Sequence, residues 1–330
     1  MKDNTLLKVK NLHTYFRTEH GLIPSVNGVS FEVKEGETLA IVGESGSGKS
    51  VTSLSIMGLI EPPGKVEDGE ILFQNKDLTK VSNKEYRKLR GNDIAMVFQE
   101  PLSSLNPLFT IGNQISESIK LHQNVDKKEA KKRSIEMLNH VGIPRADKVY
   151  DSFPHTLSGG MRQRVMIAIA LSCQPKLLIA DEPTTALDVT IQAQILKLMK
   201  DLAKEEDTAI LLITHDLGVV AEMADKVVVM YAGQVVEYTD VFTLFSSPKH
   251  PYTKGLLDST PKFFDSDEKL ESIKGTVPTP DSMPKGCKFH PRCPFAMDIC
   301  IAQEPTLDKI EGLADQDVRC WLYNDKEAAI

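Results

Sequence analysis

The sequence contains no apolar segment near the length of about 18 residues that a membrane-spanning helix requires. Its start, MKDNTLLKVKNLHTYF, also lacks the apolar stretch and the small-residue cleavage site of a secretory signal. We therefore expect the chain to stay in the cytoplasm and to reach a membrane only through a partner protein.

An excess of positive charge is missing as well. The 330 residues include 39 Lys and Arg against 46 Asp and Glu, for a formal net charge of −7. Proteins that bind nucleic acid usually carry a basic surface, so we expect no nucleic-acid partner. Hydrophobic residues make up 41% of the chain. That share is ordinary for a soluble globular protein, and the length suggests about two domains.

The order of the segments predicts an α/β domain over residues 1–245, because short β-type and helical segments alternate there. Helices are expected from near Lys49 and around Thr190–Glu206. The expected strands are Thr38–Val42, Ile71–Phe73, Ile94–Phe98, Lys176–Asp181, Ala209–Thr214 and Lys226–Met230.

The strand pattern stops between Gly112 and Cys173, where Lys127–Val141 has apolar residues at helical spacing. We expect a helical subdomain at about residues 100–173, inserted into the α/β core. After Phe245 prolines become dense, as in GTVPTPDSMPKGC. Residues 246–330 are therefore expected to form a separate C-terminal domain.

One short segment fits the phosphate-binding pattern G-x-x-x-x-G-K-[ST]. It reads Gly43-Glu44-Ser45-Gly46-Ser47-Gly48-Lys49-Ser50. The glycines let the backbone turn its N–H groups toward β- and γ-phosphates, and the following helix adds its positive end. Lys49 supplies a point charge to the phosphates, and the Ser50 hydroxyl can bind Mg²⁺. The apolar strand before the segment argues against a chance Gly/Ser-rich loop.

Two acids, Asp181 and Glu182, end a second apolar strand. Two carboxylates at a buried strand end are costly unless they serve a cation or a reaction. Asp181 is the natural partner of Mg²⁺, directly or through water. Glu182 is then placed to polarise the water that attacks the γ-phosphate.

A third motif, Leu157-Ser158-Gly159-Gly160-Met161-Arg162-Gln163, places two glycines before a helical run over Met161–Cys173. It predicts a second helix N-terminus suited to phosphate. The motif resembles the LSGGQ signature of the ABC (ATP-binding cassette) family, with Met161 at its last position. The resemblance implies a P-loop NTPase cassette with a RecA-like core, an antiparallel β subdomain and a helical signature subdomain. It also implies two cassettes paired head to tail, with Ser158, Gly159, Gly160 and Gln163 on the partner's nucleotide.

Other positions match the family's pattern in order and spacing. Gln99 corresponds to the Q-loop glutamine, which contacts ATP and senses Mg²⁺ and the membrane partner. Asp188, in Ala186-Leu187-Asp188, corresponds to the D-loop at the dimer interface. The resemblance implies ATP and Mg²⁺ as ligands, with Glu182 and the switch histidine His215 as catalytic residues. An aromatic ring is expected on adenine, and Phe16 fits best, with Tyr15 a close rival.

The spacing between the motifs and the number of cassettes distinguish among the members of this family. About a hundred residues lie between Ser50 and Leu157, too few for the long coiled coil of chromosome and repair proteins. Translation factors of the family usually carry two cassettes, and only one is present here. A transporter motor is therefore favoured over a soluble, non-transport ABC ATPase.

Three segments resemble the oligopeptide and dipeptide permeases: Gln99–Pro107, His250–Thr253 and Gly286–Pro294. This resemblance implies a D-type ATPase of a peptide importer at the cytoplasmic face of a prokaryotic membrane. Its expected partners are an F-type ATPase, two transmembrane permease subunits and an extracytoplasmic peptide-binding protein. Nickel and some other solute importers share the same tail, so nickel or another solute stays an alternative substrate.

Four of the five cysteines lie near the C-terminus: Cys287, Cys293, Cys300 and Cys320. In a reducing compartment such a cluster indicates metal before disulfides. Five, six and nineteen residues separate them, whereas zinc sites favour closer pairs. We expect a [4Fe–4S] cluster, which the resemblance also implies, with zinc or no metal as alternatives. Such a cluster would staple a small core. Cys173 is expected to be an ordinary buried thiol.

Overall fold

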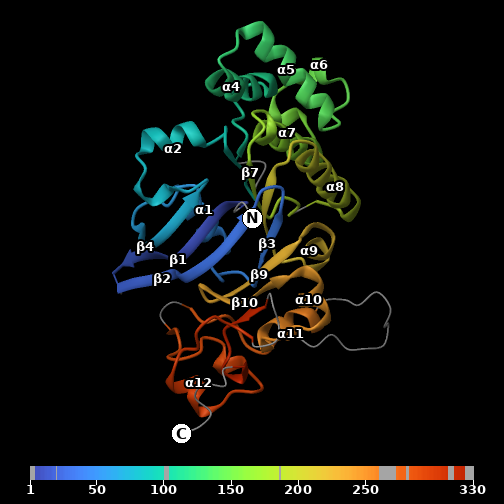
Figure 1. Ribbon diagram of the computed structural model, residues 1–330. Helices are drawn as coiled ribbons and strands as arrows, with labels where there is room; N and C mark the ends of the chain where they lie inside the picture. The colour runs from blue at the N-terminus through green and yellow to red at the C-terminus, as the bar shows by residue number, and fades with distance from the viewer. Residues whose placement is uncertain are drawn as a thin grey trace. The chain divides into compact units, whose positions relative to one another are not determined.

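The computed structural model describes residues 4–19, 21–99, 104–185, 187–259, 273–279, 282–310 and 316–323 (Figure 1). The chain forms two compact units. The P-loop unit comprises Leu7–Glu32, Leu39–Thr79 and Ile213–Ile330. The signature unit comprises Met1–Leu6, Val33–Thr38 and Lys80–Leu212. Within the described residues, no helix combines the length and the apolar character needed to cross a membrane.

An antiparallel sheet in the P-loop unit has the strand order β2-β1-β4-β5. Its strands are β1 (Thr5–Thr18), β2 (Gly21–Lys34), β4 (Gly64–Phe73) and β5 (Lys76–Asp77). Along β1, Leu7 and Val9 are buried while Lys8 and Lys10 are more exposed, the alternation of a strand with one covered face. β1 pairs with β4 so that Phe16 lies opposite Gly64.

A second set of strands in the same unit follows the order β11-β12-β10-β9-β3. They are β3 (Thr38–Val42), β9 (Lys226–Tyr231), β10 (Gln234–Asp240), β11 (Asp308–Lys309) and β12 (Asp317–Val318). β3 and β9 are parallel, and both are almost continuously apolar, as strands covered on two faces must be. The other neighbours are antiparallel, so the end of the chain extends the set of strands from which the P-loop starts.

The P-loop unit also contains helices and short 3₁₀ turns. They are α1 (Lys49–Ile56), α9 (Leu217–Met223), α10 (Val241–Ser246), α11 (Pro251–Asp258) and α12 (Asp298–Ala302), with 3₁₀ turns at Leu78–Lys80, His290–Arg292 and Trp321–Tyr323. One apolar cluster joins Val42 and Val229 to Tyr231, Tyr252 and Phe289. Residues after Phe245 thus share their core with β3 and β9.

The signature unit contains the strand order β8-β7-β6, with β6 (Ile94–Val97), β7 (Leu177–Asp181) and β8 (Ala209–Thr214). Its helices are α2 (Asn83–Leu89), α4 (Ile111–Gln123), α5 (Lys127–His140), α6 (Ala146–Tyr150), α7 (Gly159–Leu171) and α8 (Val189–Glu205), with a 3₁₀ turn at Pro154–Thr156. α4 packs against α5, α6 and α7, the green group of Figure 1.

Side chains at the helix starts fix where these helices begin. Thr110, Asp126, Ser158 and Asp188 each accept a backbone N–H three residues further on. The predicted start of the signature helix at Met161 is therefore corrected to Gly159. The two glycines form its first turn, because the cap is Ser158.

Candidate functional site

The P-loop follows β3 with three glycines at positive φ: +151° at Gly43, +80° at Gly46 and +98° at Gly48. A Cβ on Gly43 would lie 2.2 Å from the Met230 carbonyl oxygen, and one on Gly48 2.5 Å from that of Ser25. These two positions therefore exclude any side chain on grounds of space as well as conformation. The loop is held close to β9 and β2.

Two groups of the P-loop suit a phosphate. The Lys49 side chain is buried, and its Nζ donates to the carbonyl oxygens of Gly43 (2.7 Å) and Glu44 (3.0 Å). Ser47 Oγ is buried and finds no hydrogen-bond partner among the described residues. A buried hydroxyl without a partner calls for a ligand or a structural reason. Together with the backbone turns at the three positive-φ glycines, these groups fit an anion of the phosphate class.

His215 comes after β8 and belongs to the P-loop unit. It lines a cavity of about 310 Å³ together with Gly43 and Glu44 of the P-loop. The remaining lining residues are Val42, Asp216, Leu217, Leu256 and Ser259. The structure thus places His215, the expected switch histidine, beside Glu44, which lies 171 residues earlier in the chain (215 − 44).

The two candidates for adenine differ in their contacts. The Tyr15 hydroxyl donates to Asn27 Oδ1 (3.2 Å) and lies 3.1 Å from His13 Nδ1. Burial and the nearby carboxylates raise its pKa. The Phe16 ring instead packs over Gly64, where a Cβ would meet it at 2.5 Å. The Tyr15 hydroxyl is thus engaged with polar neighbours, and Phe16 stays the preferred prediction.

In the signature unit, the structure brings Gln99 and Glu182 together across 83 positions of sequence. Gln99 Nε2 donates to Glu182 Oε2 at 2.8 Å, and Thr185 Oγ1 donates to the same oxygen at 3.0 Å. Glu182 has φ +46°, an uncommon conformation for a residue with a side chain. Asp181 ends β7 and is buried. Thr185 was not identified from the sequence, although a hydroxyl residue three positions after an acid can indicate a local side-chain hydrogen bond.

The signature residues divide into exposed and buried ones. Ser158 and Gly159 are exposed at the start of α7, where Ser158 Oγ accepts the Met161 N–H at 3.4 Å. Gln163, expected to serve the partner's nucleotide, is buried, and its side-chain amide donates to the Pro183 carbonyl. Gly160 lies close to α8, since a Cβ there would be 2.9 Å from Ile191.

The remaining family positions are placed only in part. Asp188 is exposed and caps α8, accepting the Ile191 N–H at 2.9 Å. Ala186 of the expected D-loop lies outside the described residues, as do residues 100–103 of the extended Q-loop.

The four C-terminal cysteines are free thiols, with Cys300 and Cys320 buried and the other two half-buried. Burial and the neighbouring thiols raise the pKa of Cys287 and Cys293, and raise that of Cys320 to about 12. The thiols are therefore within electrostatic reach of one another. Among the described residues, no three His, Cys, Asp or Glu side chains are grouped to hold one metal ion. The described residues therefore show no metal-binding group, for zinc or for an iron–sulfur cluster.

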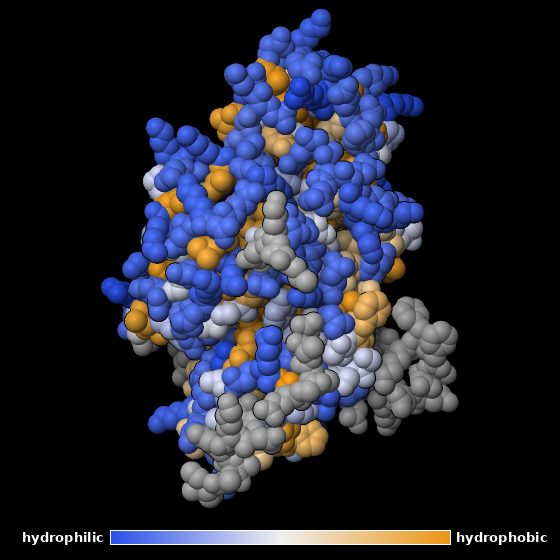
Figure 2. Space-filling model, viewed as in Figure 1, coloured by the Kyte–Doolittle hydropathy of each residue, from blue (hydrophilic) through white to orange (hydrophobic). Residues whose placement is uncertain are grey.

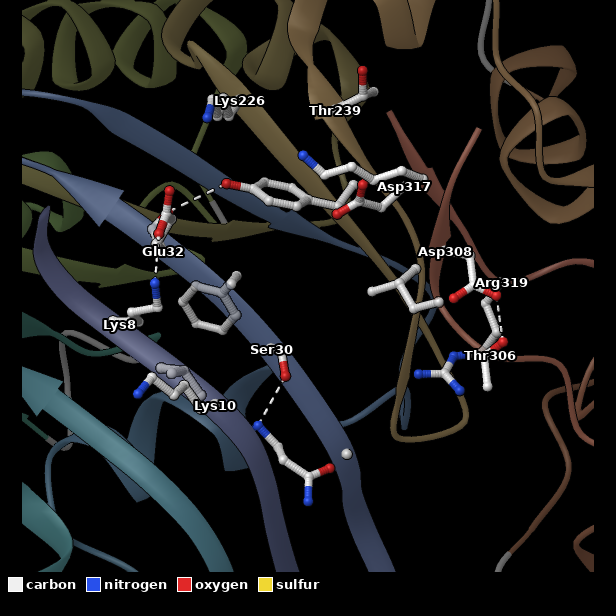
Figure 3. Close-up of a pocket in the computed structure, with 17 residues that line it drawn as sticks. Lys8, Lys10, Ser30, Glu32, Lys226, Thr239, Thr306, Asp308, Asp317 and Arg319 are labelled. Carbon is white, nitrogen blue, oxygen red and sulfur yellow. Dashed lines mark hydrogen bonds and ion pairs between the residues drawn. The ribbon is translucent and has the colours of Figure 1, made fainter. Parts of the chain in front are cut away.

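A larger cavity of about 680 Å³ also lies in the P-loop unit (Figure 3). Residues of β1 and β2 line one side, and Thr306, Asp308 and Arg319 line the other. Its charges have both signs and are partly paired, as in the 3.3 Å contact of Lys8 with Glu32. Among the described residues that line it, none belongs to the P-loop, so we separate this cavity from the nucleotide site.

Comparisons with known proteins show the family to which the chain is related. The family described as ABC transporter matches residues 26–185, and the oligopeptide/dipeptide transporter C-terminal region matches residues 236–300. The oligopeptide transport ATP-binding protein AppD of Bacillus subtilis is 58% identical, covering 98% of this chain and 99% of its own. The dipeptide transport ATP-binding protein DppD of Escherichia coli is 53% identical, covering 92% and 93%. A dimeric ATP-binding cassette solved with ADP and Pi is 30% identical, with a TM-score of 0.65, over 71% of this chain and 98% of that one.

Proposed function

The chain belongs to the ATP-binding subunits of oligopeptide and dipeptide ABC transporters, and from this membership we propose that it is the motor of a peptide importer. As an ABC ATPase it hydrolyses ATP. One observation carries the peptide assignment. The region that matches peptide transporters, residues 236–300, shares a core with the strands beside the P-loop.

We assign ATP binding to the P-loop, Gly43–Ser50, with Lys49 and the Ser47 hydroxyl directed to phosphate. Mg²⁺, when bound, neutralises phosphate charge, and Ser50, Asp181 and Gln99 supply oxygen atoms suited to it. Phe16 is assigned to adenine and His215 to the γ-phosphate. The cavity shared by His215 and the P-loop supports the last assignment.

Glu182 is assigned as the general base that polarises the attacking water. Two donors, from Gln99 and Thr185, fix one of its carboxylate oxygens. A base held in this way loses little conformational freedom when the reaction begins. Gln99 would then link the state of the Q-loop to the orientation of the base.

The proposed assembly contains a second, F-type ATPase, two transmembrane permease subunits and an extracytoplasmic peptide-binding protein. Exposed Ser158 and Gly159 support a role for Ser158, Gly159 and Gly160 on the partner's nucleotide, with exposed Asp188 at the same interface. Gln163 is assigned to holding α7 against the turn after Glu182. Exposed Leu108 and Phe109, next to the Q-loop segment, support docking to membrane subunits at the cytoplasmic face.

The test is ATPase stimulation in the reconstituted transporter. We expect peptide-loaded binding protein to raise turnover, and Glu182→Gln to abolish the response. Stimulation by nickel and not by peptide would select the nickel alternative. A purified complex without membrane subunits would favour a soluble ABC ATPase.

We further propose that Cys287, Cys293, Cys300 and Cys320 hold a [4Fe–4S] cluster that staples residues 246–330. The Cys287 N–H donates to the Cys300 carbonyl at 2.9 Å, and this contact between two of the cysteines supports the proposal, although the described residues form no group of three metal-binding side chains. Near four irons and four sulfides per chain are expected after anaerobic purification, and Cys293→Ser should lose them. Stoichiometric zinc in the purified chain would show that the cysteines bind a zinc ion and not a cluster. Absence of both iron and zinc would refute the proposed cluster.

A further inference from the structure

The side chain of Glu44, the second residue of the P-loop, is bound by an arginine 248 residues further along the chain. Arg292 donates from one terminal nitrogen to Glu44 Oε2 (2.7 Å) and from the other to Oε1 (3.1 Å). Two parallel bonds of this kind form a bidentate pair, which is stronger and more directional than a single contact. The Arg292 side chain is only 4% exposed, whereas that of Glu44 is 32% exposed.

The other side of the guanidinium is fixed to the C-terminal segment. Arg292 Nε donates to the Lys274 carbonyl (2.9 Å), and a terminal nitrogen donates to that of Gly275 (3.2 Å). Its guanidinium carbon lies 5.7 Å from the centre of the Tyr231 ring. Arg292 therefore cannot follow Glu44 if the loop moves, and its position is set by the segment it belongs to.

The backbone of Glu44 is held from the same direction. Its N–H donates to the Tyr252 hydroxyl at 2.8 Å. Tyr252 is fully buried, and its ring centre lies 4.7 Å from that of Tyr231 and 5.4 Å from that of Phe289. Glu44 is thus held at both its side chain and its main chain by residues that follow Phe245.

The consequence concerns the neighbouring phosphate site. Gly43 and Glu44 supply the carbonyls that bind the Lys49 ammonium, so displacement of Glu44 displaces the charge meant for phosphate. An unpaired Glu44 carboxylate would also repel a triphosphate at short range. A loop held in its binding conformation loses less entropy when the ligand arrives.

We propose that Arg292 is a positioning residue for ATP, which holds Glu44 and thereby the P-loop in the form that binds triphosphate. The C-terminal segment then sets the ATP affinity of the loop on which it packs. This inference rests on the proposed role of the P-loop in ATP binding.

The decisive measurement is the ATP dissociation constant of the full-length chain, with the KM and kcat of the complete transporter. Arg292→Gln should weaken ATP binding about tenfold and raise KM alike, while kcat at saturating ATP changes little. Arg319→Gln is the matched control. Arg319 is also buried in the C-terminal segment, but it donates to the carbonyls of Val235 and Pro305, outside the P-loop. Equal loss of ATP affinity in both variants would show that any disturbance of the C-terminal segment weakens ATP binding. That result would overturn the proposal.

A double-mutant cycle tests whether the effect passes through Glu44. Arg292→Gln combined with Glu44→Gln should bind ATP no more weakly than the weaker single variant, because both remove one interaction. Additive losses would contradict the route through Glu44. If Arg292→Gln does not fold, Arg292→Lys is the variant to test. A lysine keeps the positive charge but cannot form the bidentate pair with Glu44. Unchanged affinity in Arg292→Lys and Glu44→Gln would then overturn the proposal.

The wild-type chain separates this inference from the proposed function. Failure of the folded wild type to bind ATP would refute the P-loop assignment. Tight binding by the wild type and equally tight binding by the folded Arg292→Gln variant would refute only the role of Arg292.

Discussion

The two units fix their functional residues in different ways. In the signature unit most of the hydrogen bonds that hold these residues are local. Ser158 and Asp188 each accept the backbone N–H of the residue three positions later, and Thr185 donates to Glu182, three positions earlier. In the P-loop unit the contacts on Glu44 come from 208 and 248 residues away. Local contacts form with the segment itself, whereas distant ones exist only when the whole unit is folded.

This difference has a functional meaning. Long-range contacts make the P-loop sensitive to the state of the C-terminal segment. In the signature unit, the cap on the Met161 N–H comes from within the same turn, from Ser158. The longest of these contacts in the signature unit is that of Gln99, which joins Glu182 from 83 residues away. The base itself therefore depends on one contact of each kind.

The largest effect expected is at this base. Glu182→Gln should lower turnover at this ATP site by about a hundredfold or more, the range for loss of a general base, while ATP still binds. Thr185→Val removes only one neutral donor and should lower turnover about threefold to tenfold. The measurement is single-site ATPase activity in a complex whose other site is disabled. Near-normal turnover by Glu182→Gln would remove it from the role of base.

The sequence predicted what is local and missed much of what is distant. Thr38–Val42 and Ala209–Thr214 form strands with the predicted bounds, since each is an apolar run with a single threonine at one end. β12 could not be found in this way, because two residues carry no period and gain their conformation from β10.

The same holds for the candidate site. Sequence spacing singled out Gln99 and Glu182 separately, and their contact is seen only in the fold. The burial of Gln163 and its bond to Pro183 depend on how α7 packs, which no spacing encodes. Nothing in the motif Gly43–Ser50 pointed to Arg292, because its partner lies in another region of the sequence.

The next effect concerns the charge within the P-loop. Lys49→Met keeps most of the aliphatic stem but removes a charged donor, and should weaken ATP binding about tenfold to a hundredfold. A larger loss than that of Arg292→Gln is expected, because Lys49 acts on phosphate and Arg292 only through Glu44. Nucleotide titration of the two purified variants checks the order. The reverse order would mean that the distant contacts matter more than the motif itself.

A pH effect tests the distant contacts in the P-loop unit. Burial lowers the pKa of His250 to about 3, so the folded state holds a neutral ring that caps α11 through the Tyr252 N–H. The unfolded chain, with a pKa near 6.5, binds the proton first as the pH falls. Stability should therefore fall below about pH 6.5, by about 2 kcal/mol at pH 5 from this residue.

The matched variant for this prediction is His250→Asn, which retains an N-cap acceptor without a titrating group. Denaturant unfolding of both proteins at pH 7.5 and pH 5 gives the comparison. The wild type should lose more stability than the variant between these pH values. Parallel losses would show that His250 titrates normally in the folded chain.

The smallest effect expected lies at the local cap of the signature helix. Ser158→Ala removes the acceptor of the Met161 N–H and should cost about 1 kcal/mol of stability, whereas Ser158→Gly should cost only a few tenths. Because the cap acts within its own turn, ATP affinity at the chain's own P-loop should not change. Hydrogen exchange of the α7 amides, with nucleotide titration beside it, measures both quantities. A loss of ATP affinity in Ser158→Ala would show that the signature helix and the P-loop are coupled within one chain, and the contrast between local and distant fixing would not hold.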